Sequence, residues 1–363
     1  MRAETERGNR DRLFRSVRRL PPGSFAFVMA SGILSTAFEQ VHWSAVSVAL
    51  LVVAIAGGIV IAIAQVWRLC AYPRELAADA RNPSVSFGFL TVVAAINVVG
   101  VRLFTPQAPA ATIALTIISV PVWILLVYGL PAALMLGPSI RPAIQSADGS
   151  WFLWVVSTQS LAVATGVLGE HYATEALAAL ATALWGIGVM LYLMLATLVT
   201  LKLLTASHDG DGTMNPSYWI YMGATAITVL AGSQLVNMPL GLPIVEAVRP
   251  VVAGFTFVLW AFGVWWIPLL VVFGVWRHAV RRVPLRYEAG LWSIVFPLGM
   301  FAVASVHFGR AEHLELMTVI GFVGTGVAAL AWLLSFGAMC AAGLRGIRPG
   351  SGQDATRGVR LES

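Results

Sequence analysis

The sequence predicts an all-α polytopic membrane protein in which ten transmembrane helices form five helical hairpins around a central pore. Its 363 residues are 58% hydrophobic and only 11% charged, with a mean hydropathy of +0.81. A water-soluble chain cannot bury so much apolar surface, so the bilayer must serve as solvent. Two further observations, the spacing of apolar segments and the placement of basic residues, give the number of helices and their orientation.

Ten apolar segments approach the length of about 20 residues that a helix needs to cross a bilayer. They span residues 22–39, 44–70, 85–104, 110–136, 151–169, 173–204, 216–237, 245–276, 289–308 and 314–344.

The basic residues orient these segments. If the N-terminus is cytoplasmic and the segments alternate, only Arg102, Arg249 and Arg310 lie outside, and the other 20 of the 23 basic residues lie inside. Cytoplasmic loops carry the excess of Lys and Arg in membrane proteins. We therefore predict a multi-pass protein of the plasma (cytoplasmic) membrane with both termini cytoplasmic. A basic N-terminal tail (1–20) and a C-terminal tail (346–363) flank the transmembrane pore domain (21–345).

The segments alternate in composition. Even-numbered segments are long and almost uniformly apolar, whereas odd-numbered segments are shorter and contain small and polar residues. The odd segments also begin alike, with a Ser or Gly followed by a large apolar residue, as in Gly23-Ser24-Phe25, Gly149-Ser150-Trp151 and Pro216-Ser217-Tyr218. A recurring unit sets the architecture. We expect five hairpins in a ring, with the mixed helices lining a pore and the apolar helices outside. The alternative is an ordinary ten-helix bundle held by small-residue contacts.

Ionisable residues are missing from the middle of every segment; all lie in tails, in loops or near segment ends. Intramembrane acids mark proton relays and cation sites, and a membrane hydrolase needs paired acids, a His cluster or a metal. The pattern therefore argues against an enzyme, a metal site or a cofactor. The net charge of +6 is dispersed, which argues against nucleic-acid binding. A pore without carboxylates and with a positive cytoplasmic mouth favours small inorganic or organic anions.

The ninth segment contains the stretch from Trp292 to Phe301, which has a proline at its centre. Pro297 removes one backbone N–H and bends the helix, and Gly299 leaves room at the bend. Phe296 places a large ring beside this bend. Two roles remain open for Phe296 from these residues alone: a packing side chain, or a plug in the pore.

Further candidates come from the odd segments and their outer ends. The pore-lining candidates are Phe27, Gly32, Thr91, Thr158, Gly223 and Thr225. The outer-vestibule candidates are Arg102, His307 and Arg310, for which anchoring to lipid headgroups is an equal alternative. We expect interhelical hydrogen bonds from the side-chain amides of Asn97, Gln159 and Gln234.

Three stretches carry a resemblance to a known family: Pro21-Pro22-Gly23-Ser24-Phe25, Asn215-Pro216-Ser217-Tyr218, and Trp292-Ser293-Ile294-Val295-Phe296-Pro297. In this order they resemble the tellurite-resistance/dicarboxylate transporter family, which includes plant slow-type anion channels, fungal malate permeases and fungal sulfite efflux pumps. The resemblance covers roughly residues 20 to 345.

The resemblance implies a homotrimer with a separate pore in each protomer, lined by the odd helices and blocked midway by a phenylalanine of the ninth helix. Phe296 is the matching residue, which favours the plug. The chain departs from the family in that several pore helices are expected to bend at prolines. Here only the ninth has a central proline, so glycines such as Gly32, Gly100 and Gly223 would have to take that role.

Two functions follow. The first is a transmembrane anion channel whose pore is occluded by Phe296. The alternative is a carrier, with or without proton coupling, for C4-dicarboxylates such as malate, or an efflux protein for oxyanions such as sulfite or tellurite. Glu39 and His307 are the nearest titratable residues for proton coupling.

Overall fold

The computed structural model describes residue 14 and residues 16–137, 145–205 and 214–347, the side chains only as far as residue 344. Within these ranges every regular element is a helix. The predicted tails, residues 1–20 and 346–363, lie largely outside the described part. Eight helices are long and apolar enough to cross a membrane. An all-helical, multi-pass membrane protein is therefore confirmed, whereas the number of ten spans stays a prediction.

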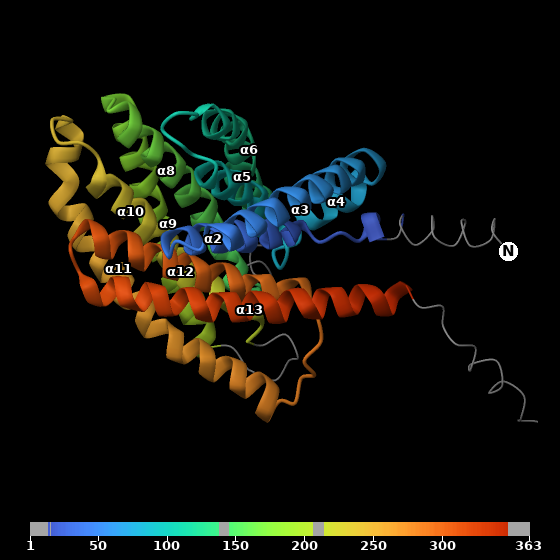
Figure 1. Ribbon diagram of the computed structural model, residues 1–363. Coiled ribbons are helices and arrows are strands. Elements are labelled where there is room, and N and C mark those ends of the chain that lie inside the picture. Colours follow the sequence, from blue (N-terminus) through green and yellow to red (C-terminus); the bar gives the residue numbers. More distant parts are fainter. Residues whose placement is uncertain (1–13, 15, 138–144, 206–213, 348–363) are drawn as a thin grey trace, which may run out of the picture.

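Five inner helices, labelled in Figure 1, form a ring. They are α2 (Ala26–Gln40), α5 (Thr91–Arg102), α8 (Leu153–Tyr172), α10 (Trp219–Asn237) and α12 (Trp292–Ala311). Contacts run from α2 to α5, α8, α10, α12 and back to α2, so the ring is closed. The first two are shorter than the other three and are not among the eight long apolar helices.

Five outer helices each pack against the inner helix that precedes them in the chain. They are α3 (Ser44–Ala71), α6 (Ala110–Met135), α9 (Glu175–Thr205), α11 (Pro243–Val275) and α13 (Glu315–Ile347). Two short helical elements sit outside this scheme, α4 (Pro73–Ala80) and the π-helical turn η5 (Trp276–Val280).

Burial separates the two sets. The most apolar windows of the spans containing α8 and α10 are 94% buried, and that containing α12 is 67% buried. The corresponding windows of the five outer helices are 17–28% buried. Small residues on the inner helices permit this close packing, and the uniformly apolar outer helices present the surface that lipid requires. The contrast agrees with the alternation predicted from composition.

Tryptophans fasten outer helices to the next inner helix around the ring. The Nε1 atoms of four outer-helix tryptophans donate hydrogen bonds at 2.8–3.2 Å: Trp123 to Thr158 Oγ1, Trp185 to the Thr228 carbonyl, Trp260 to Ser305 Oγ, and Trp332 to Ser31 Oγ. The fifth junction, between α3 and α5, uses Arg102 of α5 instead, which donates to Ser47 of α3. The repetition therefore includes the contacts between successive hairpins as well as the hairpins themselves.

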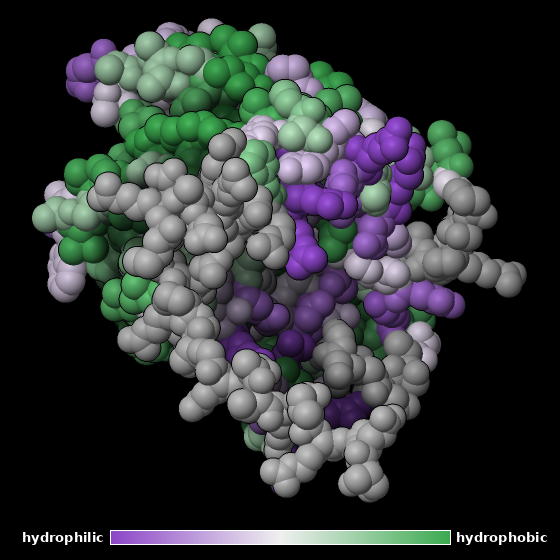
Figure 2. All heavy atoms as spheres, turned by 90° about the vertical axis from the view of Figure 1, so that its right-hand side faces the viewer, coloured by the Kyte–Doolittle hydropathy of each residue, from purple (hydrophilic) through white to green (hydrophobic). Residues whose placement is uncertain are grey.

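Each inner helix begins with a short turn of 3₁₀ helix. These turns are η1 (Pro22–Phe25), η2 (Ser86–Leu90), η3 (Gly149–Phe152), η4 (Pro216–Tyr218) and η6 (Ala289–Leu291). They are the recurring starts seen in the sequence. All five meet at one end of the bundle, which we call the basal end; the opposite end is the apical end. Figure 2 views the basal end, where polar side chains gather around a hollow in the middle of the face.

Candidate functional site

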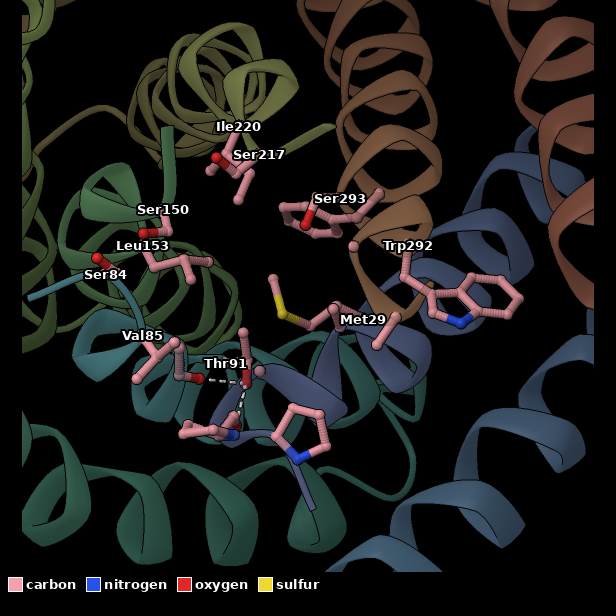
Figure 3. A pocket seen from close by; sticks show the side chains of 18 residues that line it. Met29, Ser84, Val85, Thr91, Ser150, Leu153, Ser217, Ile220, Trp292 and Ser293 are labelled. Carbon is pink, nitrogen blue, oxygen red and sulfur yellow. Dashed lines mark hydrogen bonds between the residues drawn. The ribbon is translucent and has the colours of Figure 1, made fainter. Parts of the chain in front are cut away.

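A cavity of about 170 Å³ opens at the basal end, and we call it the basal cavity. Residues from all five helix starts line it, including Pro22, Gly88, Ser150, Ser217 and Ala289. Side chains from the first turns of the inner helices, such as Met29, Thr91, Leu153 and Ser293, point into it (Figure 3). The basal cavity therefore lies on the axis of the ring.

Asp148 joins the starts of α8 and α10 beside this cavity. Its Oδ1 accepts hydrogen bonds from the Ser150 backbone N–H at 2.9 Å and the Ser150 hydroxyl at 2.6 Å. Its Oδ2 accepts from Asn215 Nδ2 at 2.9 Å and from Ser217 Oγ at 3.1 Å. Its carboxylate is thus held by donors within the protein and is not among the residues that line the cavity.

Gly149 makes this junction sterically possible. A Cβ atom built on Gly149 would lie only 2.0 Å from the backbone oxygen of Ser217. We expect Gly149→Ala to destabilise the protein by about 1–3 kcal/mol through overpacking, measured as a lower thermal midpoint in detergent. Gly186→Ala on α9 is the control, because no atom lies within 4 Å of its added Cβ. An equal midpoint in the two variants would contradict the tight η3–η4 contact.

A second cavity of about 30 Å³ lies further along the same axis, and we call it the axial cavity. All five inner helices line it again, through Ile33, Thr36, Asn97, Val98, Val101, Ser160, Val163, Ile227, Leu230 and Met300. It is small but large enough to hold water. Asn97 Nδ2 donates to Ser160 Oγ at 3.1 Å, and Ser119 Oγ donates to Asn97 Oδ1 at 2.9 Å.

Phe296 lies at the inner limit of the basal cavity and is 2% exposed. On α12, Ser293 and Phe296 line the basal cavity, and Met300, one turn further, lines the axial cavity. Helical spacing of three and four residues puts these side chains on one face. Among the described residues that line the two cavities, none carries a charged side chain.

Pro297 and Gly299 fix the position of Phe296 between neighbouring helices. A Cβ on Gly223 of α10 would meet Pro297 Cγ at 2.8 Å, and a Cβ on Gly299 would meet Ile33 Cγ2 at 2.9 Å. Since Pro297 has no N–H, the carbonyl four residues earlier, on Ser293, loses its helical partner beside the basal cavity. This part of α12 therefore packs directly against α10 and α2.

The predicted pore-lining residues fall into three groups. Thr91 lines the basal cavity, and its Oγ1 donates to the Gly88 carbonyl at 2.7 Å. Gly32 and Gly223 lie at contacts between inner helices, Gly32 against Val98 and Gly223 against Pro297.

The other three pore-lining candidates lie at contacts with the outer helices. Thr158 accepts the hydrogen bond from Trp123. Thr225 faces Gly263 of α11. Phe27 packs edge-on against Trp292 and lines a separate groove near α3. Polarity alone did not indicate which face of each helix turns toward the axis.

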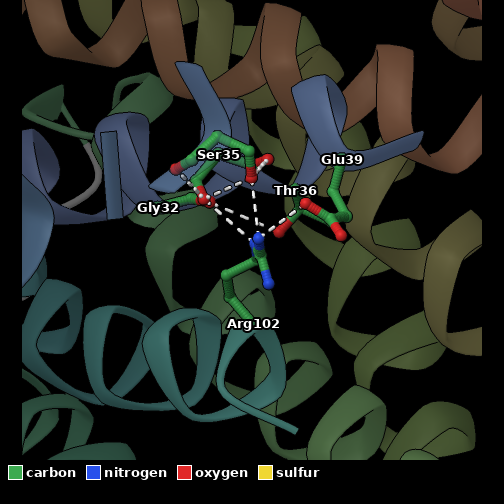
Figure 4. Close-up of polar contacts among 6 residues, drawn as sticks. Gly32, Ser35, Thr36, Glu39 and Arg102 are labelled. Carbon is green, nitrogen blue, oxygen red and sulfur yellow. Dashed lines mark hydrogen bonds and ion pairs between the residues drawn. The ribbon is translucent and has the colours of Figure 1, made fainter. Parts of the chain in front are cut away.

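Arg102 forms a bridge at the apical end (Figure 4). Its Nε donates to Ser35 Oγ at 3.0 Å, and its Nη2 donates to Glu39 Oε2 at 2.8 Å and Ser47 Oγ at 2.7 Å. These contacts tie α5 to α2 and α3. Glu39, one of the residues considered for proton coupling, is the ion-pair partner of Arg102.

His307 and Arg310 also bridge helices at the apical end. His307 contacts Ser233 Oγ through Nδ1 at 2.7 Å and Gln234 Nε2 through its own Nε2 at 3.2 Å. Arg310 Nη2 donates to the Gln40 carbonyl at 3.1 Å. The lining of the axial cavity includes neither of them, nor Arg102.

The interhelical role expected for the three amides is confirmed. Asn97 and Gln234 make the bonds already described, and Gln159 Nε2 donates to the Trp185 carbonyl at 3.1 Å. Asn97 additionally lines the axial cavity, as does Ser160. Ser160, Ser293 and Met300 were not predicted to line the path along the axis. The helical spacing of Ser293, Phe296 and Met300 could have indicated that these three residues share one face of α12. The described residues contain no group of three His, Cys, Asp or Glu side chains placed to hold a metal ion.

This chain is similar to several known membrane proteins and to one protein family. An uncharacterized membrane protein of Mycobacterium tuberculosis is 46% identical over 151 residues, which cover 42% of this chain and 76% of the relative. An uncharacterized transporter of Methanocaldococcus jannaschii is 31% identical over 153 residues, covering 42% of this chain and 41% of the relative. The sulfite efflux pump SSU1 of Trichophyton rubrum is 22% identical over 347 residues, which cover 87% of this chain and 88% of the relative. Residues 19–340 match the SLAC1 family, described as voltage-dependent anion channel. The resemblance drawn from the sequence is thereby confirmed, and the chain belongs to the SLAC1 family of anion channels and transporters.

Proposed function

We propose that this protein conducts small anions along the axis of its inner helices and that Phe296 closes the path between the basal and axial cavities. The observation that carries the proposal is the pair of uncharged cavities on one axis, each lined by all five inner helices. Phe296 lines the basal cavity, and Met300, one helical turn further along α12, lines the axial cavity.

The basal cavity favours anions for a physical reason. Each inner helix starts there, and a helix N-terminus carries a partial positive charge of about half an elementary charge. Five such ends face a cavity whose described lining has no carboxylate. The path therefore attracts anions without a fixed cation that would trap them.

The proposal includes the orientation and assembly expected from the sequence. The basal end is cytoplasmic, in keeping with the basic residues at that end. The protein is a homotrimer in the plasma membrane, with one pore in each protomer.

Ion selectivity tests this function. In planar bilayers with a potassium chloride gradient, we expect the reversal potential of the current to follow chloride. Chloride, nitrate, sulfite and malate are then compared at equal activity, in wild type and in a Phe296→Ala variant. We expect the compact inorganic anions to carry more current than malate, because the axial cavity is small. A reversal potential that follows potassium would contradict an anion path.

A second candidate, an oxyanion or dicarboxylate carrier, is favoured by one observation. A relative that aligns over 87% of this chain is a sulfite efflux pump. Saturable sulfite or malate uptake into liposomes, without an accompanying current in either wild type or Phe296→Ala, would support the carrier over the channel. Loss of that uptake on dissipating a proton gradient would add proton coupling.

A further inference from the structure

A groove of about 500 Å³ lies on the side of the bundle toward its basal end. Its floor is the start of α2 and of α12, and its rims are α3, through Gly57, Val60 and Ile61, and α13, through Met339. Gly57 lies at the middle of α3, and Val60, Ile61 and Met339 fall in the later halves of α3 and α13, which both run toward the basal end. The groove is thus an opening between two outer helices in the basal half of the membrane-spanning region.

The groove and the basal cavity share a wall. Pro21, Gly23, Ala289 and Trp292 line both. The indole of Trp292 packs edge-on against Phe27 with ring centroids 4.9 Å apart, and its Nε1 donates to the Tyr287 hydroxyl at 3.2 Å. Since Trp292 precedes Phe296 by one helical turn, the groove reaches the base of the gating helix.

The lining of the groove is suited to a hydrocarbon chain. Its polar side chains are Ser24 and Tyr287, and both already have partners within the protein: Ser24 Oγ donates to the Pro21 carbonyl at 2.6 Å, and the Tyr287 hydroxyl accepts from Trp292. The rim residue Val60 is 66% exposed. In a multi-pass membrane protein, an apolar opening between outer helices is in contact with acyl chains.

Two arginines stand next to lining residues of the groove in the chain. Arg19 directly precedes the lining residue Leu20, and Arg286 directly precedes the lining residue Tyr287. Both arginines are exposed, and the contacts found among the described residues give neither of them an acidic partner. Two other arginines, Arg18 and Arg277, are in contrast paired with Glu75 and Glu288. Unpaired cations at a membrane surface attract anionic headgroups.

We propose that this groove is a binding site for an anionic phospholipid, with one acyl chain between α3 and α13 and the phosphate near Arg19 and Arg286. The site goes beyond the anion path. A lipid bound there contacts Trp292 from outside the basal cavity, so its binding supports the wall that carries Phe296.

Native mass spectrometry of the purified protein with dioleoyl phosphatidylglycerol or dioleoyl phosphatidylcholine tests the charge requirement. Wild type is expected to retain phosphatidylglycerol in preference to phosphatidylcholine. The double variant Arg19→Gln/Arg286→Gln is expected to bind phosphatidylglycerol about tenfold more weakly. Arg74→Gln/Arg81→Gln removes the same charge from exposed positions on and beside α4 and should bind like wild type. Equal weakening in both double variants, or no preference in wild type, would overturn the proposal.

A second pair of variants tests the groove itself. Val60→Trp fills the groove from its rim, whereas Val52→Trp adds the same side chain to α3 at a position that is 59% exposed and outside the groove. Both face lipid, so both are expected to fold, which size-exclusion chromatography checks. Val60→Trp should lose the retained phosphatidylglycerol and Val52→Trp should keep it. Retention of the lipid by Val60→Trp would place it elsewhere and overturn the proposal.

Discussion

Replacing Phe296 with alanine is expected to raise the anion current by about a hundredfold or more. An anion that passes an apolar constriction loses hydration at a cost of several kcal/mol. Recovering about 3 kcal/mol of that cost by removing the ring corresponds to roughly a hundredfold in rate. The Phe296 side chain is 2% exposed at the limit of the basal cavity. Single-channel and macroscopic currents in planar bilayers measure the effect.

Phe301→Ala provides the matched control. Phe301 lies on the same helix and is also buried, at 5% exposed, but it stacks on Trp260 of α11 with ring centroids 6.1 Å apart. Its loss leaves a void between α12 and an outer helix, so we expect lower stability and an unchanged current. If a folded Phe296→Ala protein carries no more current than Phe301→Ala, Phe296 does not close the path.

The coarse fold could be predicted because membrane solvation leaves a strong mark on composition. Outer helices need apolar side chains on every lipid-facing position, whereas inner helices need small residues to approach one another. The sequence around Leu50 and that around Ser157 therefore differ visibly, and burial follows the same division. The shared helix starts could also be predicted from the sequence, because each inner helix begins with a similar turn at the same basal end.

Polarity did not allow us to predict which side chains point toward the axis of the ring. Thr158 and Thr225 seemed suited to a pore, yet a hydroxyl within a membrane gains more from a partner inside the protein than from a small cavity. Thr158 accordingly meets Trp123, and Thr225 faces Gly263. The polar residues that do line the two cavities, such as Thr91, Asn97 and Ser160, are no more polar than these two threonines, so polarity could not separate the two groups.

The position of Phe27 depended on a residue of another helix. A Cβ on Gly57 of α3 would lie only 2.4 Å from the Phe27 ring, so the missing side chain of Gly57 leaves the space that the ring fills. Nothing near Phe27 in the chain indicates this pairing. The contacts of Arg102 are a similar case: its bonds to Ser35 and Ser47 depend on how α2, α3 and α5 meet, which the sequence near Arg102 does not indicate.

Placing a carboxylate in the axial cavity is expected to suppress the anion current of the opened pore. Asn97 is 1% exposed and lines this cavity, and aspartate has nearly the same shape. A negative charge about 6 Å from a passing anion costs about 3 kcal/mol at an effective dielectric constant of about 20. Asn97→Asp combined with Phe296→Ala should therefore carry roughly a hundredfold less anion current than Phe296→Ala alone. The reversal potential in a potassium chloride gradient should move away from that of chloride.

Two comparisons separate this charge effect from damage to the helix contacts of Asn97. Asn97→Leu, in the same Phe296→Ala background, removes the bonds to Ser119 and Ser160 without adding charge, so its current should stay selective for anions. Acidification should relieve the block in Asn97→Asp, because protonation removes the introduced charge, and it should leave Asn97→Leu unchanged. An Asn97→Asp protein that conducts chloride freely at alkaline pH would mean that the anion path bypasses the axial cavity. The basal cavity would then have to connect to the far side by another route.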